Sequence, residues 1–224
     1  GPLLWTRRPE HWNFLSLRLG VGRAESRNEI AEPNSPDGIP KYARQIEKLQ
    51  ERHKWVEDVP LVETFPSAGA IGIAGSKEAA ADIMRGLAVQ IFGMHAPNEV
   101  ITAAIVDPSW THEMEWMKWL PHTTSARSPF AEIALADSQS AGTALLNALE
   151  EAILQRSDQA ASHRGPLKTG HGSMALGSVV GEAISERADL GKDLVLVLFV
   201  SADAPVDRPR LTQVIERGAD SGIY

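Results

Sequence analysis

Residues 70–83 read AIGIAGSKEAAADI, a stretch that predicts a strand, a tight turn and a helix in direct succession. The apolar run at 70–73 leads into a Gly/Ser turn, Gly75 and Ser76, and then into an alanine-rich helix. Loops that bind phosphate have this layout, because the N–H groups and the dipole at a helix N-terminus attract the anion. In such loops a lysine reaches the outer phosphates and a Ser or Thr holds Mg²⁺. The stretch therefore predicts an α/β fold with the outline of a phosphate site.

The residues that carry out phosphate chemistry are missing from this outline. If residues 70–73 are the strand before the loop, the Gly-Lys-Ser/Thr positions fall on the alanines at 79–81, which have neither ammonium nor hydroxyl groups. A second register uses Lys77, but Ser76 then replaces the preceding glycine and Glu78 replaces the Ser/Thr. A carboxylate in the first helical turn is stabilised by the helix dipole and would repel a polyphosphate. An ordinary strand–turn–helix unit is the alternative interpretation.

Apolar patterns predict alternating strands and helices along the chain. Strands are expected at residues 12–21, 61–64, 70–73, 100–106, 133–136 and 194–200, and helices at 41–55, 78–92, 143–154, 179–188 and 208–217. Residues 22–40 and 157–173 are expected to be loops. The alternation predicts a mostly parallel sheet flanked by helices. The last residues, ERGADSGIY at 216–224, resemble the exit of a helix toward a next parallel strand.

A second feature of P-loop ATPases is also degenerate. In these proteins a buried strand ends in an aspartate that supports Mg²⁺. The candidate strand, LVLVLFV at 194–200, is followed by Ser201, Ala202 and Asp203, so the acid is displaced. Asp203 reaches a metal only if the strand ends late; otherwise Asp203 and Asp207 serve the turn and the start of the next helix.

Walker A and Walker B positions are therefore both degenerate, and no catalytic residue is predicted. If a nucleotide does bind, the expected contacts are Gly75, Ser76, Lys77 and Asp203.

The bulk properties exclude several classes of site. The chain has 224 residues, no cysteine and a net charge of −7. The charge argues against nucleic-acid binding, which depends on neutralising phosphates. Without cysteine or closely spaced histidines, no zinc or other metal site is predicted. The length suits one large domain, expected to comprise residues 3–224, whereas Gly1-Pro2 is typical of a protease-cleavage scar on a fragment of a larger protein.

A tryptophan-rich segment, WTHEMEWMKWLPH at 110–122, follows the strand expected at 100–106. Trp116, Trp119 and Leu120 are spaced to share one helical face, and Pro121 would end that helix. Core packing is the first interpretation of this segment, and an aromatic docking surface is the alternative.

Four segments carry a resemblance to a known family: RRPEHWNFLSLRLGVG (7–22), PLVETFPSAGAIGIAG (60–75), MEWMKWLPH (114–122) and LVLFVSADAPVDRPRLTQVIERGADSGIY (196–224). They are similar to the EccC/EssC membrane ATPases of type VII secretion systems, relatives of the FtsK/SpoIIIE motors. The matching part of those proteins is the cytosolic module between the transmembrane helices and the first of three tandem ATPase domains. The resemblance extends over residues 4–224, and residues 119–122 and 202–208 are its most specific parts.

The resemblance implies a P-loop-like α/β fold in a parent protein that is anchored in the inner membrane and exports small helical-hairpin proteins. The module would lie at the cytoplasmic face and contact other secretion subunits and the adjoining ATPase domains. Those other domains would bind ATP and Mg²⁺, whereas no cofactor is expected in this module.

Three functions stay open at this point. The first is a non-catalytic module that couples the membrane part to the ATPase domains during protein export. The second is an ATP-hydrolysing domain with an unusual P-loop, in which Lys77 and Asp203 take displaced roles. The third is a DNA-translocase-type module, which the net charge of −7 disfavours.

Overall fold

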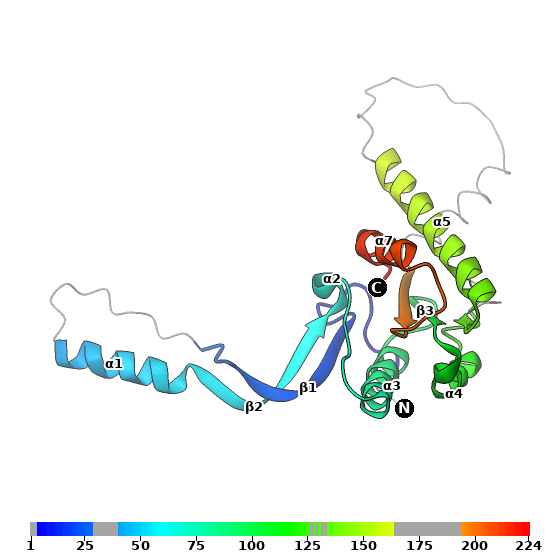
Figure 1. Cartoon of the computed structure of the whole chain (residues 1–224). Coiled ribbons are helices and arrows are strands. Elements are labelled where there is room, and N and C mark those ends of the chain that lie inside the picture. The colour runs from blue at the N-terminus through cyan, green and yellow to red at the C-terminus, as the bar shows by residue number, and fades with distance from the viewer. Residues whose placement is uncertain (1–3, 29–39, 126–127, 129, 131–133, 164–193) are drawn as a thin grey trace, which may run out of the picture. The chain divides into compact units, whose positions relative to one another are not determined.

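A computed structural model describes residues 4–28, 40–125, 128, 130, 134–163 and 194–224 (Figure 1). The chain divides into two compact units. Residues 1–15 and 64–224 form the first, here called the sheet unit, and residues 16–63 form the second, the β1–β2 unit. Whether the two act as the one domain expected over residues 3–224 stays a prediction.

The sheet unit is built on three parallel strands in the order β4 (Leu135–Ala136), β3 (Val100–Ile105) and β5 (Val195–Val200). Every residue of β3 is buried, as its continuous apolar sequence predicts for a central parallel strand. The predicted α/β class, with a parallel sheet flanked by helices, is confirmed, and the architecture is compatible with a P-loop-like fold.

Helices cover both faces of this sheet. The main ones are α3 (Lys77–Met94), α5 (Gln139–His163) and α7 (Arg208–Gly218), and shorter helical pieces are α2 (Phe65–Ala68), η1 (Pro108–Trp110), α4 (Thr111–Met114), η2 (Glu115–Trp119) and η3 (Ala219–Ser221). Ile101, Ala103 and Ile105 of β3 pack in one apolar core with α5 and α7. On the opposite face Phe199 of β5 contacts Phe92 of α3, with ring centroids 6.4 Å apart. The sheet is therefore sandwiched between α3 and the α5–α7 pair.

The C-terminus begins a further parallel strand beside β5. Leu196 and Ile223 form a parallel bridge. The Tyr224 N–H donates to the Leu196 carbonyl at 2.9 Å, and the Leu198 N–H donates to the Tyr224 carbonyl at 2.7 Å. Arg156 of α5 fixes the preceding turn, because its guanidinium donates to the carbonyls of Ser221 and Leu194. The expectation that residues 216–224 leave a helix toward a next parallel strand is confirmed.

The β1–β2 unit holds β1 (Ser16–Glu25), α1 (Pro40–His53) and β2 (Trp55–Thr64), and the two strands form a separate sheet. The Ser26 N–H donates to the Lys54 carbonyl at 2.7 Å, so the end of β1 lies beside the start of β2. Large apolar side chains are exposed on this pair, among them Leu19, Val21, Trp55, Val56, Leu61 and Val62. A two-stranded sheet has only one neighbour for each strand and so buries little apolar surface.

Several predicted boundaries are wrong. Residues 22–25, expected in a loop, continue β1 because they pair with β2. Residues 157–163, also expected in a loop, continue α5, which helix-favouring residues such as the alanines there allow. β2 begins at Trp55, well before the strand expected at 61–64. The helix expected at 179–188, the remainder of both loops and the scar at 1–2 lie outside the described residues.

The strand expected at 70–73 is the most informative difference. These residues belong to no strand of the described structure, and they connect α2 to α3 without regular secondary structure. Their exposure nevertheless alternates, with Ile71 and Ile73 half-buried and Ala70, Gly72 and Ala74 exposed. That is the alternation of a strand, but the segment pairs with neither of the sheets in the described part of the chain.

Candidate functional site

The turn before α3 completes its own helix start. Ser76 is the N-cap of α3, and its Oγ accepts a hydrogen bond from the Ala79 N–H at 3.3 Å. The cap therefore occupies one of the N–H groups that a phosphate would use. Glu78 lies exposed in the first helical turn, where the positive end of the helix dipole stabilises its carboxylate. A negative ligand approaching this turn meets a carboxylate of the chain itself.

The Lys77 ammonium is engaged by a neighbouring segment of the chain. Its Nζ donates a hydrogen bond to the carbonyl of Ser109. The same Nζ lies 5.5 Å from the ring centroid of Trp110, a cation–π distance. Both partners belong to η1, which follows β3. To serve a phosphate, Lys77 would have to give up both interactions.

The alanines at 79–81 lie near the start of α3, which begins at Lys77. Ala81 is 2% exposed and packs in the core, and Ala80 lines the cavity described below. Neither backbone conformation nor space requires a glycine at position 75. Its φ is not positive, and an added Cβ would meet only Ala79, at 3.7 Å.

The residues after β5 hold the sheet edge together. Ser201 is buried, its Oγ accepts from the Asp107 N–H at 2.7 Å, and its own N–H donates to the Ile105 carbonyl at 3.1 Å. Asp203 is exposed and lies 3.6 Å from the Arg208 guanidinium. Asp207 is the N-cap of α7, where its Oδ1 accepts from the Arg210 N–H at 2.9 Å. Asp207 thus serves the start of the helix, as one interpretation of the sequence expected.

Sequence reasoning missed Asp107, although an acid directly after the buried run at 100–106 was the available signal. Asp107 follows β3, and its Oδ1 accepts from the Ser109 N–H at 2.9 Å. Hydrogen bonds from Ser109 hold the pKa of the Asp107 carboxyl below its ordinary value, and the Lys77 charge adds to the effect. Lys77, Asp107 and Ser201 therefore gather at the carboxyl edge of the sheet, where ligands of open α/β sheets bind.

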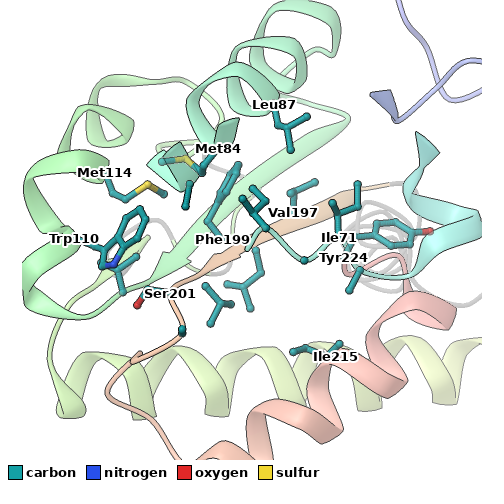
Figure 2. Close-up of a pocket in the computed structure, with 18 of the residues that line it drawn as sticks. Ile71, Met84, Leu87, Trp110, Met114, Val197, Phe199, Ser201, Ile215 and Tyr224 are labelled. Carbon is teal, nitrogen blue, oxygen red and sulfur yellow. The ribbon is translucent and has the colours of Figure 1, made fainter. Parts of the chain in front are cut away.

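A cavity of about 550 Å³ lies beside this cluster. Three of the four residues predicted to contact a nucleotide, Gly75, Lys77 and Asp203, line it. Most of the wall is apolar, and Figure 2 shows these side chains between α3, β5 and α7: Ile71, Met84, Leu87, Trp110, Met114, Val197, Phe199, Ile215 and Tyr224. Trp110 and Met114 belong to the segment for which an aromatic docking surface was the alternative. The other apolar residues of the wall were not predicted to contact a ligand, because they come from distant segments. The volume is in the range of ligand pockets, but the lining favours apolar groups over a triphosphate.

Comparison with known proteins finds sequence relatives from secretion systems. No protein-family model matches the chain. The ESX-4 secretion system protein EccC4 of Mycobacterium tuberculosis is 25% identical over 169 residues, which cover 71% of this chain and 14% of that protein. The ESX-5 secretion system protein EccC5 of Mycobacterium marinum is 30% identical over 56% of this chain and 9% of its own length. The ESX secretion system protein EccC of Geobacillus thermodenitrificans is 28% identical over 68% of this chain.

The chain is thus similar to EccC proteins of ESX secretion systems over more than half of its length. It spans about a tenth of the length of the curated relatives that it matches. Among the residues that the structure describes, no helix is both long enough and apolar enough to cross a membrane. Within the same described part of the chain, no group of three or more His, Cys, Asp or Glu side chains is arranged to hold a metal ion.

The tryptophan-rich segment of this EccC relative breaks into α4 and the 3-10 helix η2. Trp116 packs edge-on against Phe92, with centroids 5.8 Å apart, and its Nε1 donates to the Glu113 carbonyl at 2.7 Å. Trp119 is 79% exposed, so the core-packing interpretation is wrong for this residue. Both residues lie in the 3-10 helix η2 (Glu115–Trp119), not in the α-helix that the sequence predicted.

Proposed function

We propose that this EccC-family segment is a non-catalytic, P-loop-like module of an ESX secretion system. It would couple a membrane-anchored part of the parent protein to ATPase domains elsewhere in the same chain. The observation that carries the proposal is the engagement of Lys77 by Ser109 and Trp110, beside a helix N-terminus that Ser76 already caps.

The other side chains at the two expected nucleotide-binding positions support the same proposal. Glu78 adds negative charge where phosphate would sit, and the alanines at 79–81 supply no group for phosphate or Mg²⁺. Asp203 is 85% exposed beside Arg208, so solvent and an arginine compete with any metal. In the parent protein this module would lie at the cytoplasmic face of the inner membrane, in contact with other secretion subunits, adjoining ATPase domains and, through the parent, exported proteins.

Thermal unfolding with saturating Mg-ATP tests the proposal. A ligand at a hundred times its Kd stabilises the native state by about 2.7 kcal/mol. In a domain of this size that is a rise in Tm of roughly 5–10 °C. We expect no such rise at millimolar Mg-ATP, because Lys77 and the helix N-terminus are already occupied. A rise of that size, lost in the Lys77→Ala variant, would overturn the proposal.

A second candidate function is an ATP-binding and ATP-hydrolysing domain with an unusual P-loop. The observation that favours it is that Gly75, Lys77 and Asp203 line one cavity. In that case Lys77→Ala and Asp203→Asn would each abolish ATP turnover of the full-length protein. If ATP turnover survives both substitutions, ATP is hydrolysed by other domains of the full-length protein.

A further inference from the structure

Residues 4–14, here called the strap, are held by the C-terminal end of α3. The Trp5 and Arg7 N–H groups donate to the carbonyls of residues 93 and 94, respectively, each at 2.9 Å. The Trp5 indole Nε1 donates to the Phe92 carbonyl at 3.1 Å. The last carbonyls of a helix have no partner within the helix itself, so the strap completes the end of α3.

His95 holds the other end of the strap. This residue directly follows α3, and its Nε2 accepts a hydrogen bond from the Leu15 N–H at 3.1 Å. Its Nδ1, which lies 3.0 Å from the Ile91 carbonyl, therefore carries the proton and donates to that carbonyl. The Phe14 ring packs edge-on against the same imidazole, with ring centroids 5.1 Å apart. One buried side chain thus connects the end of the strap to α3.

The backbone is strained at both ends of the strap. Trp5 has φ 55° and Leu15 has φ 57°, left-handed values that bulky side chains rarely adopt. Hydrogen bonds to the end of α3 fix Trp5, and the bond to His95 fixes Leu15. Such strain persists only where neighbouring contacts impose it, and it gathers at segments that switch between conformations. The docked strap therefore stores strain that undocking would relieve.

A buried carboxylate lies against the strap and is only partly satisfied. Arg8 Nε lies 2.7 Å from Glu99 Oε1, and the Glu99 side chain is 8% exposed. Its second oxygen, Oε2, is buried and has no hydrogen-bond partner among the protein groups that the structure describes. A buried polar atom without a partner destabilises the state in which it is buried. The docked position is therefore less favourable than its hydrogen bonds alone indicate.

The strap also has hydrogen bonds of its own. The Arg8 N–H donates to His11 Nδ1 at 3.2 Å, and the His11 N–H donates to the Arg8 carbonyl at 2.9 Å. The Phe14 N–H donates to the His11 carbonyl at 3.0 Å. None of these bonds involves α3, so they can survive when the strap leaves the helix. Residues 8–14 can therefore move as one body.

We propose that the strap is a detachable clamp with two positions, docked on α3 and released, and that His95 is its latch. The hinge is Leu15, whose side chain is 1% exposed and whose carbonyl accepts from the Phe65 N–H at 3.3 Å. Phe65 begins α2, and α2 leads through residues 69–76 into α3. The strap is thus connected to both ends of α3, directly at one end and through Leu15 and α2 at the other.

The use of this clamp for coupling rests on the function proposed above, whereas its two positions do not. In the docked position the strap, α2 and α3 are joined through Leu15 and His95. Release breaks the bond between these two residues and frees the Leu15 backbone to leave its strained conformation. A displacement of the strap is thereby transmitted to the segment that precedes Lys77.

Native-state hydrogen exchange tests the two positions. We expect the Trp5, Arg7 and Leu15 amides to exchange at least tenfold faster than the amides of β3, because release of the strap exposes them without global unfolding. His95→Leu removes the acceptor and should speed exchange of the three strap amides at least tenfold more. His95→Gln, which can place an oxygen acceptor near the position of Nε2, should reverse most of this effect.

Ile153→Val in α5 is the matched control. Ile153 is 7% exposed and packs in the core on the other face of the sheet, away from the strap. The substitution destabilises the docked and the released forms alike, because the core is intact in both. It should speed exchange of the β3 amides roughly threefold to tenfold and leave the strap amides unchanged.

Four results would overturn the proposal. Strap amides as slow as those of β3 in the wild-type protein would show that the strap opens only with global unfolding, and so would equal acceleration of both sets by Ile153→Val. Strap exchange that His95→Leu leaves unchanged, or that His95→Gln speeds as much as His95→Leu does, would show that the hydrogen bond is no latch. None of these results bears on the Mg-ATP melts, so the strap and the proposed function fail separately.

Discussion

His95 is a buried histidine that the fold holds neutral. Its side chain is 0% exposed, its Nε2 accepts from the Leu15 N–H at 3.1 Å, and its Nδ1 lies 3.0 Å from the Ile91 carbonyl. Burial lowers the pKa of His95 from 6.5 to about 4. His122, whose Nε2 lies 2.9 Å from the His95 carbonyl, has its pKa lowered by burial as well. Through these hydrogen bonds the two imidazoles connect residues 4–15, α3 and the segment after η2. Because their pKa values are lowered, both are neutral at neutral pH.

This environment predicts a loss of stability in mild acid. Below pH 6.5 the unfolded chain binds a proton at His95 that the native state binds only near pH 4, so the free energy of unfolding falls as the pH falls through that window. At about 1.4 kcal/mol per pKa unit, the loss at His95 approaches about 3 kcal/mol. Urea unfolding at several pH values between 7 and 4.5 measures it.

The control for this prediction is a second histidine. His95→Gln should flatten the dependence on pH between 6.5 and 5, a range in which ordinary carboxylates titrate little. His112→Gln is the matched control for the substitution itself, because the His112 side chain is 90% exposed and contributes little to packing. A wild-type profile no steeper than that of His95→Gln would contradict the burial argument.

At the scale of single elements, helix starts follow from short sequence signals. Ser76 and Asp207 cap α3 and α7 through bonds to backbone N–H groups three residues ahead. Asp207 was expected at the start of a helix, whereas Ser76 was expected only in the turn before one; both are residue types that favour N-cap positions. The start of α3 is therefore set by Ser76 without any ligand.

Removing this cap should weaken the native state measurably. Ser76→Ala should lower the free energy of unfolding by about 1 kcal/mol, because an Ala79 N–H loses its partner. For a domain of this size the change corresponds to a fall in Tm of about 2–4 °C. Thr212→Ala is the matched control: its Oγ1 bonds the Arg208 carbonyl within α7, so its loss removes no cap. Equal effects of the two substitutions in thermal melts would contradict the role of Ser76.

At the scale of the whole molecule, the β1–β2 unit is an insertion between two neighbouring residues of the sheet unit. Leu15 and Phe65, which flank it, are joined by a hydrogen bond from the Phe65 N–H to the Leu15 carbonyl at 3.3 Å. Both side chains are buried in the sheet unit, at 1% and 7% exposure. The ends of the insertion thus meet in a folded part of the chain.

Replacing residues 16–63 by a short Gly-Ser linker should leave the sheet unit folded. Because the ends already meet, the linker closes without strain, and we expect one cooperative melt with a Tm within a few degrees of the intact chain's. Circular dichroism and the dispersion of an amide NMR spectrum measure this. Loss of the cooperative transition would show that the sheet unit depends on the excised residues.

The sequence by itself determined the parts that depend on local pattern. Continuous apolar runs specify β3 and β5, a capping serine specifies the start of α3, and the alanines at 79–81 lack the groups that phosphate chemistry needs, whatever the fold around them. Such features are readable because helix and strand periods, caps and missing functional groups each lie within a few neighbouring residues.

Only the tertiary structure decided where Lys77 donates, what lines the cavity and why residues 70–73 form no strand. Lys77 meets a carbonyl 32 positions away, and the cavity gathers residues from Phe65 to Tyr224. A local pattern predicts that 70–73 can form a strand, but pairing needs a second backbone at hydrogen-bonding distance. That distance is set by the packing of the whole sheet, because the partner of a parallel strand lies far along the chain.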